Sequence, residues 1–188
     1  MHFIQLLANI LKKLTMKSII LLTIILTLSC NSTTNQIQVF EDTLGIEEAK
    51  ALNALVYDFE NNLSNIYPNL SLRKAYLQYI TDLVSLKMTS FEKFNFQTEK
   101  TKSLFKKSGL WNEVHRIDTT MAGYQVNVNG KYMRALENIK ESDTLVNRYY
   151  KSRKKDGIVQ DRIDAILNSK PNFDNYIHKR IVVLEFGY

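Results

Sequence analysis

The chain has 188 residues, of which 45% are hydrophobic, and it carries a net charge of +6 and one cysteine. This length fits one domain with a core of its own, and the single cysteine excludes an intramolecular disulfide, a thiolate zinc site and an iron–sulfur cluster. Three lysines in the first 29 residues supply half of the net charge, so the remaining +3 does not indicate nucleic-acid binding.

The composition favours an all-α fold. Only 6 Gly and 2 Pro are present, whereas sandwiches and barrels of many short strands need frequent turn residues. The 9 Phe and 10 Tyr supply bulky core material and argue against disorder. We therefore expect one helical domain over residues 37–188, a multi-helix bundle, with a minor hairpin or a terminal strand as the only β-structure.

Residues 1–29 have the layout of a secretory signal peptide. Lys17 provides a positive start, and residues 19–28 form an apolar stretch interrupted only by two threonines. This stretch is about half as long as the roughly 20 apolar residues that a transmembrane helix needs. The better leader begins at Met16, so we expect translation to start there; the alternative is an unusually long segment before the apolar stretch.

The end of the apolar stretch, Leu26–Thr27–Leu28–Ser29–Cys30, resembles the lipobox of bacterial lipoproteins. The resemblance implies that a diacylglyceryl group is attached to the sulfur of Cys30, that the chain is cleaved after Ser29, and that the new amino terminus is acylated. The alternative is a plain signal peptide or an uncleaved anchor with an incidental cysteine.

A lipidated Cys30 predicts attachment to a bacterial membrane, on its periplasmic or external side. Each buried lipid CH₂ contributes about 0.8 kcal/mol, so two or three chains anchor a protein almost permanently. Residues 30–36 then comprise the lipidated cysteine and a small, polar tether. The membrane is the first predicted partner.

Two helices are predicted at the start of the body. Apolar residues recur every three or four positions over 46–66, with two glutamates in the first turn and Pro68 after the end. Ser71 is placed to cap a second helix. The short connection predicts that the two helices lie antiparallel.

The middle of the chain is harder to interpret. A third helix is predicted over 91–108, ended by Gly109. Apolar side chains occupy every second position over residues 124–128, just before Asn129–Gly130. We therefore expect an extended or turn segment that leads into a helix at 131–140. A small hairpin at Asn129–Gly130 is the alternative.

Three helices are predicted toward the C-terminus. One is capped at Ser142, the next is ended by Pro171, and the last has helical spacing over 173–184. Because "IVVLEF" is rich in β-branched residues, a final strand is the alternative for the last segment.

No motif for catalysis or for a cofactor is found. Glycine-rich phosphate loops and nucleophile turns are absent from the sequence. Glu113, His115 and Asp118 are the least implausible catalytic or metal-binding group, although their spacing does not place them on one helix face. We expect a solvent-exposed helix surface, and no catalytic pair, at Asp161 and Asp164. We predict a protein that is not an enzyme, with no metal site and no cofactor.

A basic run is the main candidate for partner binding. Its members are Arg148, Lys151, Arg153, Lys154 and Lys155. They fit anionic headgroups, envelope polysaccharide or an acidic protein, and the alternative is an ordinary solvated helix end. A second cluster, with less weight, comprises Lys100, Lys102, Lys106 and Lys107.

Aromatic residues suggest one more hypothesis, an apolar pocket, although most aromatics at helical spacing belong to a core. The residues concerned are Tyr76, Tyr79, Phe91, Phe94 and Phe96. The sequence as a whole predicts a membrane-anchored envelope lipoprotein with a helical binding or structural domain. The alternatives are an envelope enzyme around His115 and an inhibitor or immunity-type lipoprotein.

Overall fold

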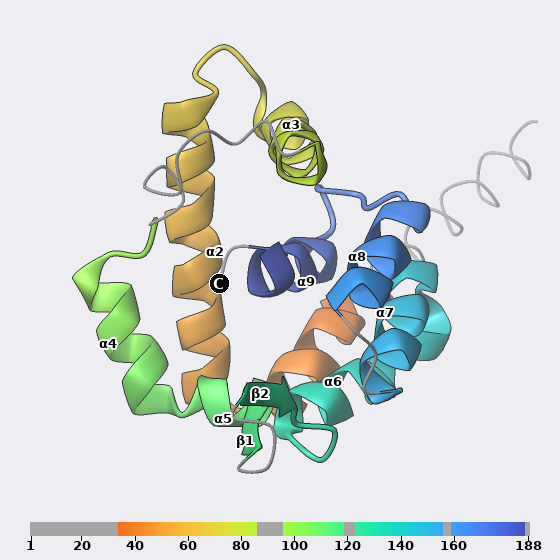
Figure 1. The fold of residues 1–188 in the computed structure, drawn as a ribbon. Helices are drawn as coiled ribbons and strands as arrows, with labels where there is room; N and C mark the ends of the chain where they lie inside the picture. Colours follow the sequence, from red (N-terminus) through yellow and green to blue (C-terminus); the bar gives the residue numbers. More distant parts are fainter. Residues whose placement is uncertain (1–33, 86–95, 119–122, 156–158, 187–188) are drawn as a thin grey trace, which may run out of the picture. The chain divides into compact units, whose positions relative to one another are not determined.

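The computed structural model describes residues 34–85, 96–118, 123–155 and 159–186 (Figure 1). The chain divides into two compact units, Met1–Gln38 and Val39–Tyr188. The first contributes only residues 34–38 to the described part, which therefore contains neither the predicted leader nor Cys30. In the second unit, helices pack on one another and the described strands form a single two-stranded sheet, so the predicted all-α multi-helix bundle is confirmed.

The helix at 34–44 begins inside the predicted tether, because residues 34–36 are already helical. Phe40 and Leu44, four residues apart, are fully buried in the second unit and give the helix an apolar face. No helix in the described part of the chain is both long and apolar enough to cross a membrane.

Helix α2, Ile46–Ile66, has the predicted bounds and forms one wall of the core. Leu52, Leu55, Phe59 and Leu63 follow its three-and-four spacing and are fully buried. Full burial of such a side chain contributes about 1.5–3 kcal/mol, so this face holds much of the unit together.

Helix α3, Leu72–Val84, starts after Ser71 as predicted, but Ser71 makes no side-chain capping bond. The predicted antiparallel arrangement is wrong, since α3 is seen end-on beside the upright α2 in Figure 1. Tyr76 explains this crossing, because its ring packs on Phe59 of α2 and also stacks on Phe173, with ring centroids 4.4 Å apart. Helix α3 is therefore held from two sides.

Helix α4, Glu99–Ser108, is shorter than predicted. Residues 96–98 are not helical, and residues 91–95 lie outside the described part. Thr98 caps the helix, and Asp58 of α2 accepts hydrogen bonds from both the backbone N–H (2.7 Å) and the hydroxyl (2.9 Å) of Thr98. These bonds fix the start of α4. Gly109, in the left-handed conformation with φ 72°, ends it as predicted.

A short helix and a hairpin follow. Helix α5, Leu110–Val114, leads into strand β1, His115–Asp118, which pairs antiparallel with β2, Gly123–Val126. The extended segment was predicted, but its partner strand was not. The alternative of a hairpin at Asn129–Gly130 is wrong, because this turn leads into helix α6, Lys131–Ile139.

Gly130 is required by a close approach of two backbone segments. A Cβ atom placed there would lie 2.0 Å from the carbonyl oxygen of Glu113. Beside it, Oε2 of Glu113 accepts a hydrogen bond from the backbone N–H of Lys131 at 2.6 Å. Helix α6 is thus joined to α5 through this glycine.

The remaining helices are a short 3₁₀ turn η2, Lys140–Ser142, followed by α7, Thr144–Lys154, α8, Val159–Asn168, and α9, Tyr176–Phe186. The predicted cap at Ser142 is wrong by one residue, because the carboxylate of Asp143 accepts from the N–H groups of Leu145 (2.8 Å) and Val146 (3.0 Å). Asp143 therefore starts α7, and Ser142 belongs to η2.

Helix α9 lies in the interior, with α2, α7 and α8 against it (Figure 1). The alternative of a final strand is wrong. Ile181, Val182 and Val183 are fully buried around the helix, where packing outweighs the weak helix propensity of β-branched residues. Arg180, also fully buried, donates to Glu41 and to Asn53 and so ties α9 to the N-terminal helices.

Candidate functional site

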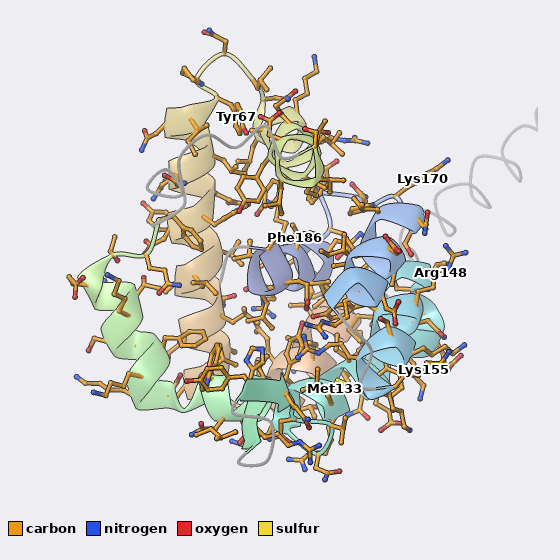
Figure 2. The ribbon with its side chains drawn as sticks, viewed as in Figure 1. Tyr67, Met133, Arg148, Lys155, Lys170 and Phe186 are labelled. Atoms are coloured by element: carbon orange, nitrogen blue, oxygen red, sulfur yellow. The ribbon has the colours of Figure 1, made fainter. Side chains whose placement is uncertain are left out.

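Helix α7 presents two different faces. Leu145, Val146, Tyr149 and Tyr150 are buried and pack inward. Exposed cationic side chains on the rest of α7 and at its C-cap are here named the α7 basic face. Its members are Arg148, Lys151, Lys154 and Lys155. Figure 2 shows Arg148 and Lys155 at the outer side of α7.

Two members of the α7 basic face have contacts within the chain. Arg148 Nη1 donates to the carbonyl oxygen of Asn168 at 3.1 Å, which leaves other guanidinium N–H groups for a further acceptor. Lys154 Nζ donates to Tyr150 Oη at 3.2 Å and lies 5.5 Å from the centroid of that ring. Arg148 and Lys154 are therefore partly oriented before any partner binds.

Arg153 is a correction to the predicted binding residues. Its side chain is 1% exposed, and Nη1 pairs with Glu185 of α9 at 2.9 Å. Nη2 donates to the carbonyl oxygen of Val114 at 3.1 Å, and Nη1 also donates to Tyr149 Oη at 2.8 Å. Arg153 follows Tyr149 by four residues, so it lies on the buried side of α7 and cannot contact an external anion.

Two hollows flank the α7 basic face. One, of about 390 Å³, lies at the start of α7 and is lined by Lys140, Asn147, Arg148 and Lys151 together with Glu141 and Asp143. The other, of about 470 Å³, lies between α7 and α8 and is lined by Arg148, Lys151 and Lys155 together with Asp161 and Asp164. Arg148 and Lys151 line both hollows, so they stand at the centre of the surface that an acidic partner would meet.

The charges in these hollows are mixed. Asp161 and Asp164 are exposed on α8, as predicted, but they line the same hollow as three cations of α7. Such carboxylates compete with an incoming anion for the same amines, and at exposed positions each pair contributes less than about 1 kcal/mol. The arrangement favours a partner with several negative charges over a single small anion.

A buried ionic network lies beneath the α7 basic face. Glu185 accepts hydrogen bonds from Tyr149 Oη (2.8 Å), from Arg153 and from Arg162 of α8. Burial opposes the charge of Arg153, but Tyr149 and Glu185 outweigh it and raise the pKa of Arg153 above its ordinary value. Arg153 therefore stays positive in the interior, where it joins α7 to α9.

His115, the centre of the predicted alternative site, is half-buried at the start of β1. Its ring lies 4.1 Å from that of Trp111, and its Nδ1 is buried without a hydrogen-bond partner. The pKa of His115 is lowered to about 4, chiefly by burial and then by the charge of Arg153, with Glu185 opposing and Arg162 adding to the decrease. The imidazole is therefore neutral near pH 7.

The structure does not bring Glu113 to His115 as a catalytic partner. Glu113 is bound to the N-terminus of α6 through the backbone of Lys131. The side chain of Asp118 lies outside the described part. His115 lines neither of the two hollows beside α7. Among the described residues, no group of three or more His, Cys, Asp and Glu side chains is arranged to hold a metal ion.

The predicted aromatic pocket is occupied by its own rings. Tyr76, Tyr79 and Phe96 each pack on Phe59, with ring centroids 4.9–5.4 Å away, and none is more than 8% exposed. Burial raises the pKa of Tyr79 to about 12, as expected for a hydroxyl inside a core. Phe91 and Phe94 lie outside the described residues. The described rings form a core cluster.

Comparison with known proteins adds no relative. No protein-family model matches the chain, and neither a curated protein nor a solved structure does.

Proposed function

We propose that this chain is a lipoprotein of the bacterial cell envelope, anchored to a membrane through lipid on Cys30, and that its helical unit is a binding module. The observation that carries the anchor is the apolar leader that ends in "LTLSC", with the only cysteine of the chain at the expected position. A lipid anchor holds the helical unit near anionic headgroups and other acidic envelope components.

The α7 basic face is the proposed contact with an acidic partner. Arg148, Lys151 and Lys155 are exposed, and two hollows meet at the first two of them. Several amines on one exposed face attract a multiply charged surface, and their effect falls with ionic strength. Arg153 contributes to this face only by holding α7 in place.

The anchor is tested by the intact mass of the protein purified from bacterial membranes, compared with Cys30→Ser. The expected mass is that of residues 30–188 plus acyl groups, and the variant is expected to lose both the acyl groups and the membrane association. An unmodified Cys30 in the soluble fraction would contradict the proposal.

The binding face is tested by photo-crosslinking in intact cells from position 151, with position 74 as the control. Both lysines are exposed, but Lys74 lies on α3 and outside the α7 basic face. We expect a crosslinked partner from position 151 alone, which disappears when Arg148 and Lys155 are both changed to Glu. Equal products from both positions would show that α7 has no special role.

The enzyme alternative has one favourable observation, the unpartnered buried Nδ1 of His115. It has less support than a binding module, because Glu113 is bound to the backbone of Lys131. An inhibitor or immunity-type lipoprotein would use the same exposed α7 basic face. The identity of the protein crosslinked from position 151 distinguishes this last alternative from a general envelope contact.

A further inference from the structure

A third hollow, of about 520 Å³, lies between α4, α5 and β2, away from the α7 basic face. Its volume falls in the range of roughly 300–1,000 Å³ that is usual for small-molecule sites. Of its lining residues, only Lys102 and Lys106 were binding candidates from the sequence, as members of the minor lysine cluster. The hollow combines an aromatic wall, two amines and two side-chain amides.

The aromatic wall consists of Trp111 and Tyr124. Their ring centroids are 5.1 Å apart and their planes are nearly perpendicular, at 86°. Trp111 is held in place from behind by His115 and Phe105. Tyr124 is 66% exposed, and Ile117, directly opposite in the strand register, is 72% exposed. Because Tyr124 lines the hollow and keeps most of its surface exposed, a ligand can reach this wall from solvent.

The opposite wall belongs to α4 and is positive. Lys102 and Lys106 are four residues apart, so they lie on the same helix face, and both line the hollow. Lys102 Nζ is bound to Glu99 at 2.8 Å, in a pair whose carboxylate side is 89% exposed. An exposed pair of this kind is weak, so an incoming anion can share the amine. Lys106 adds a second positive charge.

Polar side chains complete the hollow. Gln97 precedes the cap of α4, and Asn112 lies on α5 beside Trp111. A side-chain amide offers both a donor and an acceptor, which is the pairing that neighbouring sugar hydroxyls require. A hydrophobic hollow for a lipid tail would not need these amides.

We propose that this hollow binds an acidic sugar, a pyranose ring that carries a carboxylate or a phosphate. The Trp111 and Tyr124 rings offer an apolar surface to the C–H face of the sugar. Gln97 and Asn112 bind its hydroxyls, and Lys102 and Lys106 bind its anionic group. This site depends neither on the lipid anchor nor on the α7 basic face.

The test uses Trp111, which is the only tryptophan of the chain and lines the hollow. The full-length protein in detergent is titrated with trigalacturonate and with mannose 6-phosphate, and the tryptophan fluorescence is followed. We expect at least one of the two to give a saturable change. The uncharged counterparts, the methyl ester of trigalacturonate and mannose, are expected to bind at least tenfold more weakly.

Matched variants locate the binding. Tyr124→Ala and Lys106→Gln are expected to weaken it about tenfold each. The controls are Tyr57→Ala, whose side chain on α2 is also 66% exposed, and Lys107→Gln on the same helix as Lys106. Both controls are expected to bind like the unchanged protein. Circular dichroism verifies that all four variants are folded.

Three results would overturn the proposal. The first is no saturable fluorescence change with either acidic sugar. The second is an equal loss of affinity in Tyr124→Ala and Tyr57→Ala, or equal binding of the uncharged counterparts. The third is stronger binding of anionic lipid vesicles or of a single-stranded oligonucleotide than of both sugars, which would assign the hollow to a different ligand class. Loss of the anchor or of the α7 contact would change none of these readouts.

Discussion

Glu185→Ala removes the acceptor at the centre of the buried network and is expected to destabilise the fold strongly. In the natural chain Glu185 accepts hydrogen bonds from Tyr149, from Arg153 and from Arg162, and the Arg153 side chain is 1% exposed. Breaking a buried pair on one side leaves an uncompensated charge and costs about 3–5 kcal/mol. Because small domains are stable by only about 5–15 kcal/mol, urea denaturation followed by circular dichroism should detect this loss easily.

The matched control is Lys50→Ala, which breaks an exposed pair with Glu47 whose side chains are 60% and 65% exposed. This change is expected to cost less than about 1 kcal/mol. The triple variant Arg153→Met, Arg162→Met and Glu185→Leu removes all three charges, and we expect it to regain at least about 2 kcal/mol relative to Glu185→Ala. If Glu185→Ala costs no more than Lys50→Ala, the network does not hold α7 to α9 and the reasoning is refuted.

Three further predictions concern a cap, a histidine and a glycine. Burial opposes the charge of Asp143, but hydrogen bonds from His178, Val146 and Leu145 outweigh this effect and lower the pKa of Asp143. Asp143→Ala should therefore cost about 1–2 kcal/mol of stability at neutral pH, and Asp143→Asn, which can still cap the helix, clearly less. Equal losses of the two variants in urea denaturation would contradict the capping role. The pKa of His115 is about 4 in the folded chain against an ordinary value of 6.5, so the unfolded chain binds this proton first and the free energy of unfolding should fall as the pH drops from 6.5 toward 4. In denaturation curves measured over this pH range, His115→Gln should reduce the dependence of stability on pH. An unchanged dependence would exclude His115 as its source. In a thermal melt, Gly130→Ala should lower the Tm several-fold more than Gly109→Ala. The new Cβ at position 130 would lie 2.0 Å from a backbone carbonyl oxygen, whereas position 109 has open space and only its φ of 72° disfavours alanine. A larger decrease in Gly109→Ala would refute the close approach at Gly130.

Helix positions were predictable where the pattern is local. The spacing over residues 46–66 predicted α2 to the residue, because every turn contributes an apolar side chain to one face. The start of α4 was missed, because it depends on Asp58, forty residues away, which binds Thr98. The steep crossing of α2 and α3 depends on Phe173 in the same way.

The candidate site was predicted only in part, and Arg153 shows why. The basic run was interpreted by charge alone, although Val146 and Tyr149 already indicated by their spacing that Arg153 belongs to the inner face of α7. Its partner Glu185 lies 32 residues further on, and no local pattern connects the two. The sugar-binding hollow was missed for a similar reason, because Trp111 and Tyr124 meet only through the hairpin register.

The central position of α9 has a consequence for how the chain folds. Arg180 binds Asn53, 127 residues earlier, and Tyr79 Oη donates to the carbonyl oxygen of Phe186, 107 residues later. Contacts between residues this far apart in the sequence slow folding, because long loops must close first. The apolar faces of α2 and α3 cannot be fully covered until α9 has been synthesised. A nascent chain that still lacks α9 therefore exposes these faces and is prone to aggregation and to chaperone binding.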